Sequence, residues 1–205
     1  MTQALVALRN AVKPSLAQLE AGDVVLVAVS GGADSLALAY AVLMEATPLA
    51  ITPVAITIDH QLQENSAAQA EKVCKQLKEM GYKNVLTEKV VVTTESGLEA
   101  GARSARYQAL DSSAEKESAV KIFLGHTRDD QAETVLLGLA RGSGAKSMAG
   151  MPTLSADGKY LRPLLRITRK ETVSYCEDSG LEYWSDPQNL DTKFSRVKAR
   201  LKVLP

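Results

Sequence analysis

Apolar positions along the chain fall into two alternating patterns. Short continuous runs predict strands that are buried on both faces, and they occupy residues 24–29, 54–58, 85–92, 120–124 and, as a short final strand, 161–165. Apolar residues spaced three and four apart predict helices at residues 3–20, 35–44, 66–80, 98–110, 129–140 and 169–180. This alternation predicts the α/β class: a doubly wound, mainly parallel five-stranded sheet flanked by helices.

The length of 205 residues predicts one domain over residues 1–205. Past residue 141 the pattern loosens into RGSGAKSMAGMP, which we expect to be a mobile or substrate-contacting loop. Residues 142–205 would then form a C-terminal part on the substrate side of the domain. Because the sequence has neither a membrane-length apolar stretch nor a secretory signal, we expect a cytoplasmic protein that does not bind membranes.

Charge and cysteine content restrict the possible partners. The 24 basic and 24 acidic residues cancel, so net charge gives no overall support for binding to nucleic acid. Basic residues nevertheless gather late in the chain, either as a solvated face or as a path for a polyanion: Arg162, Arg166, Arg169, Lys170, Lys193, Arg196, Lys198, Arg200 and Lys202. Cys74 and Cys176 belong to no C-x-x-C motif, which disfavours a cysteine-bound metal or iron–sulfur site, and we expect both to be core residues on helices.

The loop Ser30-Gly31-Gly32-Ala33-Asp34-Ser35 joins the first buried strand to a helix. Unpaired backbone N–H groups and a positive helix end meet there, which predicts an anion site. The loop matches neither the Walker pattern nor G-x-G-x-x-G, so backbone amides and the two serine hydroxyls would hold a phosphate. Asp34 would repel that phosphate unless a metal ion lay between them, which implies Mg²⁺. Alternatively, the glycines only permit a tight turn and Asp34 only stabilises the helix end.

A second group of polar residues, GHTRDDQAET at residues 125–134, follows the fourth predicted strand. His126 would leave the carboxyl end of that strand, while Asp130 and Glu133 lie three apart on one helical face. One carboxylate could bind magnesium while the other accepts a proton. The alternative is structural: Thr127 and Asp130 would form a capping box, and Glu133 would be ordinary surface charge.

These motifs carry a family resemblance. S-G-G-x-D-S resembles the pyrophosphate loop (PP-loop) of the N-type ATP pyrophosphatases, and H-x-x-D-D-x-x-E-T followed by L-x-R-G-S-G resembles the tRNA(Ile)-lysidine synthetases. The similarity runs from Val24 to Pro205 and includes, in order, Asp59-His60, Glu99-x-x-Ala102-Arg103-x-x-Arg106-Tyr107, Leu161-Arg162-Pro163-Leu164-Leu165, Asp186-Pro187-x-Asn189 and Arg196-x-x-x-Arg200.

The chain also departs from the family pattern. Gln61-Leu62-Gln63 stands where the family usually has glycine and arginine, and Val197 stands where it usually has asparagine. These changes put the contacts made there in doubt, not the ATP loop. Family members commonly continue into C-terminal domains that grip tRNA, so the chain resembles the catalytic domain alone.

The resemblance implies that lysine is ligated to C2 of the wobble cytidine in the CAU anticodon of tRNA(Ile), through an adenylated cytidine, with release of pyrophosphate and AMP. It implies ATP as co-substrate, Mg²⁺, free L-lysine and a possible homodimer. Ser30, Gly31, Gly32, Ala33, Asp34, Ser35 and Asp59 would bind ATP. Asp34 and Glu133 would hold Mg²⁺, and Arg103, Arg106 and His126 would contact the phosphate and the adenylated base. Asp130 would bind or deprotonate the incoming lysine amine. Arg196 and Arg200 would contact the adenylate or the anticodon backbone.

Alternatives stay open at this level. A tRNA thiolase of the same superfamily and a non-catalytic nucleotide-binding module both fit the glycine loop. Arg103 and Arg106 could pair with Glu99 on a helix surface, and Tyr107 could serve core packing rather than base stacking.

Overall fold

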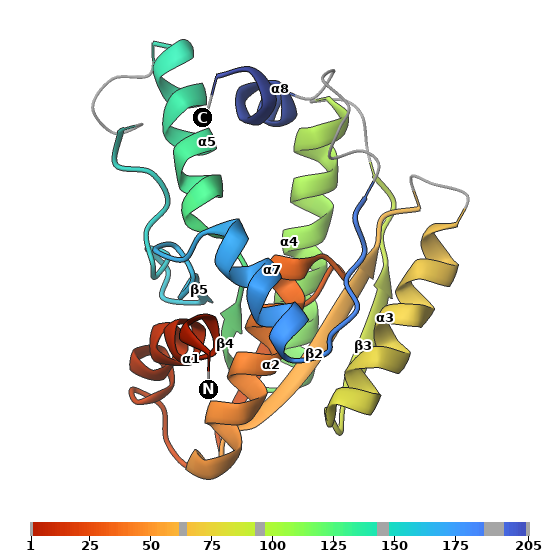
Figure 1. The fold of residues 1–205 in the computed structure, drawn as a ribbon. Helices are drawn as coiled ribbons and strands as arrows, with labels where there is room; N and C mark the ends of the chain where they lie inside the picture. The colour runs from red at the N-terminus through yellow and green to blue at the C-terminus, as the bar shows by residue number, and fades with distance from the viewer. Residues whose placement is uncertain (1, 62–64, 93–96, 143–147, 187–194, 204–205) are drawn as a thin grey trace.

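The computed structural model of this chain describes residues 2–61, 65–92, 97–142, 148–186 and 195–203. Its centre is a sheet with the strand order β3-β2-β1-β4-β5 (Figure 1). The strands are β1 (Val24–Ala28), β2 (Thr52–Asp59), β3 (Val85–Lys89), β4 (Ala119–Phe123) and β5 (Tyr160–Leu161). All pairings between these strands are parallel, which confirms the predicted sheet.

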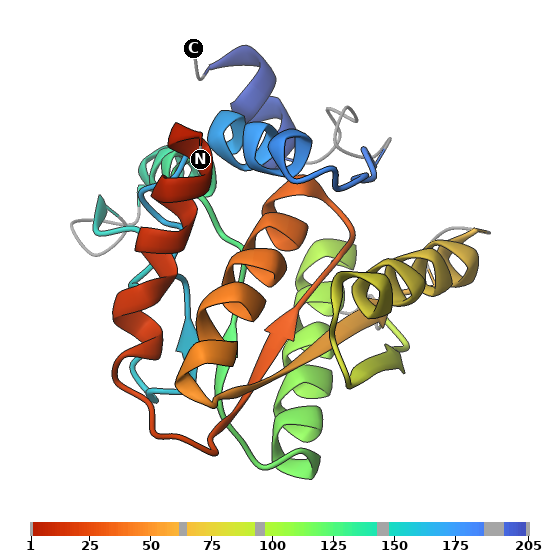
Figure 2. The ribbon, with the colours of Figure 1, turned by 60° about the horizontal axis from the view of Figure 1, so that its bottom comes forward.

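The helices fill the connections between strands and cover both faces of the sheet. They are α1 (Gln3–Leu16), α2 (Ala33–Ala46), the short 3₁₀ helix η1 (Thr47–Leu49), α3 (Ser66–Met80), α4 (Leu98–Lys116), α5 (Arg128–Ala140), α7 (Arg169–Asp178) and α8 (Ser195–Lys202). The chain moves outward from β1 to β3 and then returns to β4 and β5, so right-handed crossovers put α2 and α4 on opposite faces. Figure 2 shows α1 and α2 in front of the sheet and α4 behind it.

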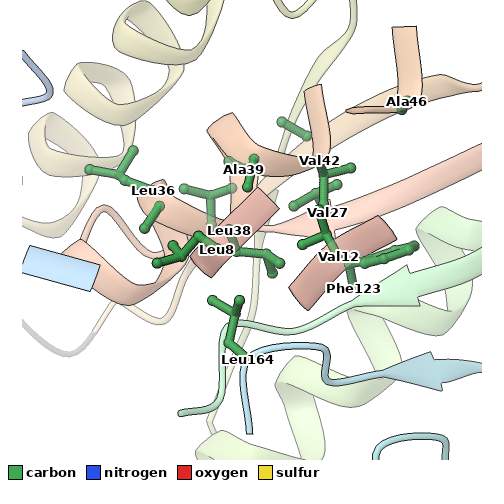
Figure 3. Packing of buried hydrophobic residues seen from close by; sticks show 14 of the residues in the cluster. Leu8, Val12, Val27, Leu36, Leu38, Ala39, Val42, Ala46, Phe123 and Leu164 are labelled. Carbon is green, nitrogen blue, oxygen red and sulfur yellow. The ribbon is translucent and has the colours of Figure 1, made fainter. Parts of the chain in front are cut away.

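Apolar side chains fill the space between the sheet and each helical layer. On one face, residues of α1, α2, α3 and α7 pack against β1 and β4. Figure 3 shows side chains of α1 and α2 beside Val27 and Phe123. On the other face, Leu110 and Ala114 of α4 pack against Leu26, Ile56 and Ile122 of the sheet. Burial of both sheet faces explains why the strands read as continuous apolar runs instead of alternating ones.

Most element boundaries agree with the sequence pattern, and the differences have physical causes. The first helix was expected to reach residue 20, but α1 ends at Leu16, within the turn that follows Pro14. Strand β3 ends at Lys89 rather than residue 92, because its pairing partner β2 ends at Asp59. The expected strand at residues 161–165 is also wrong past Leu161, since Pro163 offers no N–H to a ladder and the segment turns there.

In the part of the chain that the structure describes, no helix has the length and apolar character needed to cross a membrane.

Helix α5 rises past the end of the sheet and packs against α8 (Figure 1). The carboxyl ends of β1, β2 and β4 thus open below α5, α7 and α8, where a parallel sheet places its ligands.

Candidate functional site

The glycine loop lies between the end of β1 and the first turn of α2. Gly32 is the N-cap residue of α2 and has no side chain to bond the exposed N–H groups of the first turn. The Ser35 hydroxyl donates to the Gly32 carbonyl at 2.9 Å and accepts from the Ser30 backbone N–H at 3.1 Å. Ser35 therefore fixes the shape of the loop, while the helix N–H groups remain available to an anion.

Two glycines in this region are required by close packing. Gly31 has φ +87°, and a Cβ there would lie 2.5 Å from Cγ2 of Val73 on α3. Gly125, just after β4, has backbone atoms of α2 against it, since a Cβ would lie 3.0 Å from the Asp34 carbonyl oxygen. Only glycine lets β4 and α3 approach the loop this closely.

Asp34 faces the cleft from the first turn of α2, and both of its carboxylate oxygens have partners. Arg169 Nε and Nη2 each lie 3.1 Å from Asp34 Oδ2, and the Thr172 hydroxyl donates to Oδ1. Burial raises the pKa of Asp34, and the neighbouring Asp130 charge adds to this, although Arg169 and Thr172 oppose it. A cation beside Asp34 therefore favours the ionised form of its carboxyl group.

Asp130 caps the start of α5 and also lines the cleft. Its Oδ2 accepts from the Thr127 backbone N–H at 2.8 Å and from the Thr127 hydroxyl at 2.9 Å, which makes the capping box that the sequence suggested. Its Oδ1 lies 3.7 Å from Arg169 Nη2. The structural interpretation of Thr127 and Asp130 is therefore confirmed, and Asp130 still lines the cleft.

Glu133 is not surface charge: its side chain is fully buried. Arg200 from α8 donates through Nε to Glu133 Oε1 at 2.6 Å. The other oxygen, Oε2, is buried and has no hydrogen-bond partner among the described residues. A carboxylate oxygen in this position suits a metal ion or an ammonium group.

Two histidines stand on the cleft wall at the ends of β2 and β4. Burial lowers the pKa of His126 to about 3, with Arg106 and Arg162 acting in the same direction and Asp130 against it. Burial also lowers the pKa of His60, and Arg106 adds to this. Both imidazoles are therefore neutral near pH 7, and within the described structure neither Nδ1 has a hydrogen-bond partner.

Arginines gather around Tyr107 on α4. The Arg103 guanidinium lies 4.8 Å from the Tyr107 ring centroid and the Arg106 guanidinium 5.6 Å from it. Arg162, which is buried, approaches the Tyr107 hydroxyl at 3.5 Å. Tyr107 also packs edge to face on Tyr160, so the expectation of core packing for this ring is confirmed.

One cleft of about 780 Å³ brings most of the predicted residues together. Those that line it are Ser30, Gly32, Ala33, Asp34, Ser35, Asp59, Arg106, His126, Asp130, Glu133 and Arg200. Gly31 and the exposed Arg103 do not line it. The Arg196 side chain lies outside the described residues, as do residues 143–147 of the expected substrate loop. The glycine loop and the α5 carboxylates, predicted separately, thus share one site.

Arg169 and Thr172 are site residues that the sequence pattern did not identify. Arg169 was counted only among the late basic residues, yet it lies between Asp34 and Asp130. The available signal was the capping box formed by Thr168 and Glu171, which sets the start of α7 at Arg169. Arg162 and Arg200 also point inward, so these three late arginines do not belong to a solvated face.

Carboxylates in the cleft are the kind of oxygen ligand that Mg²⁺ prefers. Oxygen ligands are present in Asp34, Asp130 and Glu133, one of which has an unpartnered buried oxygen, and the Arg169 guanidinium already occupies a position between carboxylates. No cluster of three or more His, Cys, Asp or Glu side chains able to hold a metal occurs in the described ranges. Mg²⁺ commonly needs only one or two carboxylates when substrate phosphates complete its shell.

Comparison with known proteins gives consistent results. The tRNA(Ile)-lysidine synthase of Thermobifida fusca is 49% identical over 197 residues, which cover 96% of this chain and 60% of that protein. The enzyme of the same name from Streptomyces coelicolor is 47% identical over 91% of this chain and 53% of its own length. This chain therefore spans between half and two thirds of the length of these relatives.

A solved structure shows the same fold at much lower identity. The U34-tRNA thiolase NcsA from Methanococcus maripaludis, with its 4Fe–4S cluster, superposes with a TM-score of 0.73 and 19% identity, covering 98% of this chain and 80% of that one. A family profile described as the PP-loop domain matches residues 4–205. Because this match covers nearly the whole chain, the chain belongs to the PP-loop domain family.

Proposed function

We propose that this chain carries the catalytic site of a tRNA(Ile)-lysidine synthase: it uses ATP to join lysine to C2 of the wobble cytidine in a CAU anticodon. The observation that carries the chemistry is the cleft in which the glycine loop faces the α5 carboxylates. The relatives of that name, 49% and 47% identical, support the choice of substrate. We expect the reaction to take place in the cytoplasm, with tRNA and free lysine as partners.

In the first step, O2 of the cytosine forms a bond to the α-phosphorus of ATP while the bond to the pyrophosphate oxygen breaks. Negative charge grows on the leaving pyrophosphate, which the N–H groups of the loop before α2 are placed to stabilise. Ser35 holds that loop in shape. Bound Mg²⁺ would supply charge neutralisation at the phosphates, with Asp34 and Glu133 as its protein ligands.

The arginine group around Tyr107 supports the same step. Arg106 lines the cleft, and Arg103 and Arg162, which contact Tyr107, add positive charge near His126. We propose that Arg106 contacts the phosphate and that neutral His126 contacts the adenylated base, since an uncharged imidazole can either donate or accept. Asp59, which is buried at the end of β2, would hold the nucleotide from the opposite wall.

In the second step, the lysine ε-amine displaces AMP from C2, and it must lose its ammonium proton before it can attack. Asp130 is our candidate for binding this amine, because its Oδ1 faces the cleft while Oδ2 remains in the capping box. Arg200 and Arg196 from α8 would contact the adenylate or the anticodon backbone. Homodimer formation stays a prediction.

The decisive experiment is incorporation of labelled lysine into unmodified tRNA(Ile), with ATP and Mg²⁺, and with pyrophosphate release measured in parallel. Asp34→Asn should abolish both signals, because the substituted amide gives up the carboxylate charge that a metal ion requires. Asp157→Asn, at an exposed position outside the cleft, is the matched control and should keep both. Sulfur incorporation in place of lysine would favour the thiolase, and no pyrophosphate release with tRNA present would favour a non-catalytic binding module.

A further inference from the structure

Arg169 lies in the cleft beside Asp34, one of the two carboxylates proposed to hold Mg²⁺. It is the first residue of α7, and its guanidinium lies 3.1 Å from Asp34 Oδ2 and 3.7 Å from Asp130 Oδ1. Asp34, Asp130 and also Glu133 raise the pKa of Arg169 against the opposing effect of burial. One guanidinium therefore compensates a group of carboxylates that come from two other helices.

The contacts of Asp34 leave little room for a second cation. Arg169 donates to Oδ2 through Nε and lies equally close through Nη2, so this oxygen faces the guanidinium with two donors. Oδ1 accepts from the Thr172 hydroxyl. The positive charge of Arg169 thus lies directly against Oδ2. A metal ion at Oδ2 would be repelled by this guanidinium, so its binding there is favoured once Arg169 has moved away.

On the basis of the proposed ATP and Mg²⁺ site, we propose that Arg169 is an exchangeable counter-ion. It holds Asp34 in the ligand-free protein and transfers to a phosphate of the nucleotide when metal and nucleotide enter together. The exchange keeps charges paired throughout: the metal replaces the guanidinium at Asp34, and the phosphate replaces Asp34 at the guanidinium. Arginine suits this role because its planar donors fit carboxylate and phosphate alike.

The exchange couples the two ligands. When metal binds alone, Arg169 loses its contact with Asp34 and gains no new anionic partner. The metal therefore binds weakly. Nucleotide that arrives with the metal offers Arg169 a phosphate, so each ligand favours the binding of the other. Arg169 is thus a positioning residue that makes the site selective for the metal–nucleotide complex over the free metal.

The test measures binding alone, without tRNA or lysine. Mn²⁺ serves as the paramagnetic probe, and its affinity is determined by electron paramagnetic resonance for the parent and Arg169→Gln, with and without α,β-methylene ATP. Arg169→Gln should bind free Mn²⁺ about tenfold more tightly, because the competing charge-assisted bonds are gone. The enhancement of Mn²⁺ affinity by the nucleotide should fall by at least about tenfold relative to the parent.

Two further variants make the outcome interpretable. Arg166→Gln removes an exposed arginine near α7 that does not line the cleft, and it should behave as the parent does. Arg169→Lys keeps the positive charge and should oppose the binding of free Mn²⁺ as the parent does. This variant also provides a test if Arg169→Gln does not fold.

The proposal is overturned if Arg169→Gln binds free Mn²⁺ no more tightly than the parent, if its nucleotide enhancement is unchanged, or if Arg169→Lys admits the free metal. A failure of lysine incorporation would contradict the proposed function and leave these binding results as they are.

Discussion

The ion pair between Glu133 of α5 and Arg200 of α8 joins these two helices at the cleft. Glu133 is completely buried, whereas the Arg200 side chain retains 25% of its exposure. Arg200→Met keeps much of the side-chain volume but leaves a buried carboxylate without a counter-ion, so we expect a loss of about 3–5 kcal/mol in unfolding free energy. Glu133→Gln leaves a guanidinium that can still reach water and accept an amide partner, so its cost should be smaller, about 1–2 kcal/mol.

The assay is urea unfolding at pH 7, followed by circular dichroism, for both single variants and the double variant. The double variant should lose less than the sum of the singles, with a coupling energy of about 2 kcal/mol, because it leaves no unpaired charge. Lys198→Met removes an exposed charge from the same helix and should change stability by less than about 0.5 kcal/mol. Equal losses in unfolding free energy for the two single variants would refute the asymmetry that we derive from their burial. Strictly additive losses in the double variant would refute the coupling between Glu133 and Arg200.

Three other changes give independent tests. Gly31→Ala should lower the unfolding free energy in urea by about 2–4 kcal/mol, because of its positive φ and the overlap with Val73. Val73→Ala in the same chain should recover part of this loss. A loss below about 0.5 kcal/mol for Gly31→Ala would contradict the packing. Gly125→Ala should lower the unfolding free energy by about 1–3 kcal/mol, because its Cβ meets the backbone of Asp34. For the same reason it should weaken binding of α,β-methylene ATP, measured by calorimetry. Unchanged affinity would argue against a loop shaped by this contact. The folded-state pKa of His126 is about 3, below its ordinary value of 6.5, so the unfolded chain binds more protons between these values and stability falls as pH drops through that window. His126→Asn should make the fall between pH 7 and pH 5 shallower by up to about 1.4 kcal/mol per pH unit, and an unchanged slope in urea unfolding would refute this.

Local patterns predicted the fold well because they report directly on burial. The run at residues 24–28 reads as a strand with apolar side chains on both faces, and the structure buries its three central residues completely. Helix α3 was predicted at residues 66–80 and has these bounds, with Gly81 in the left-handed conformation at its end. Helix α4 was predicted too short, because Ala114 extends the buried face past two serines that interrupt the apolar spacing.

The candidate site was predicted in part. Glycines and carboxylates that follow strand ends must lie at one edge of a parallel sheet, so Asp34, His126 and Asp130 could be placed in the cleft from their order in the chain. The burial of Glu133 could not be predicted in this way. Only one oxygen of this carboxylate has a partner among the described residues, and that partner comes from α8, 67 positions away.

Local pattern was enough to predict the order and type of the elements, the glycine loop, and the edge of the sheet where the candidate site lies, since these depend on backbone periodicity and on parallel connections. Which cation faces which carboxylate became clear only from the packing of distant helices. Arg169 meets Asp34 across 135 positions of sequence because α7 packs on α2, and no local spacing encodes that contact. The physical reason is that periodicity fixes which face of a helix is buried, whereas the partner on that face depends on how distant elements pack together.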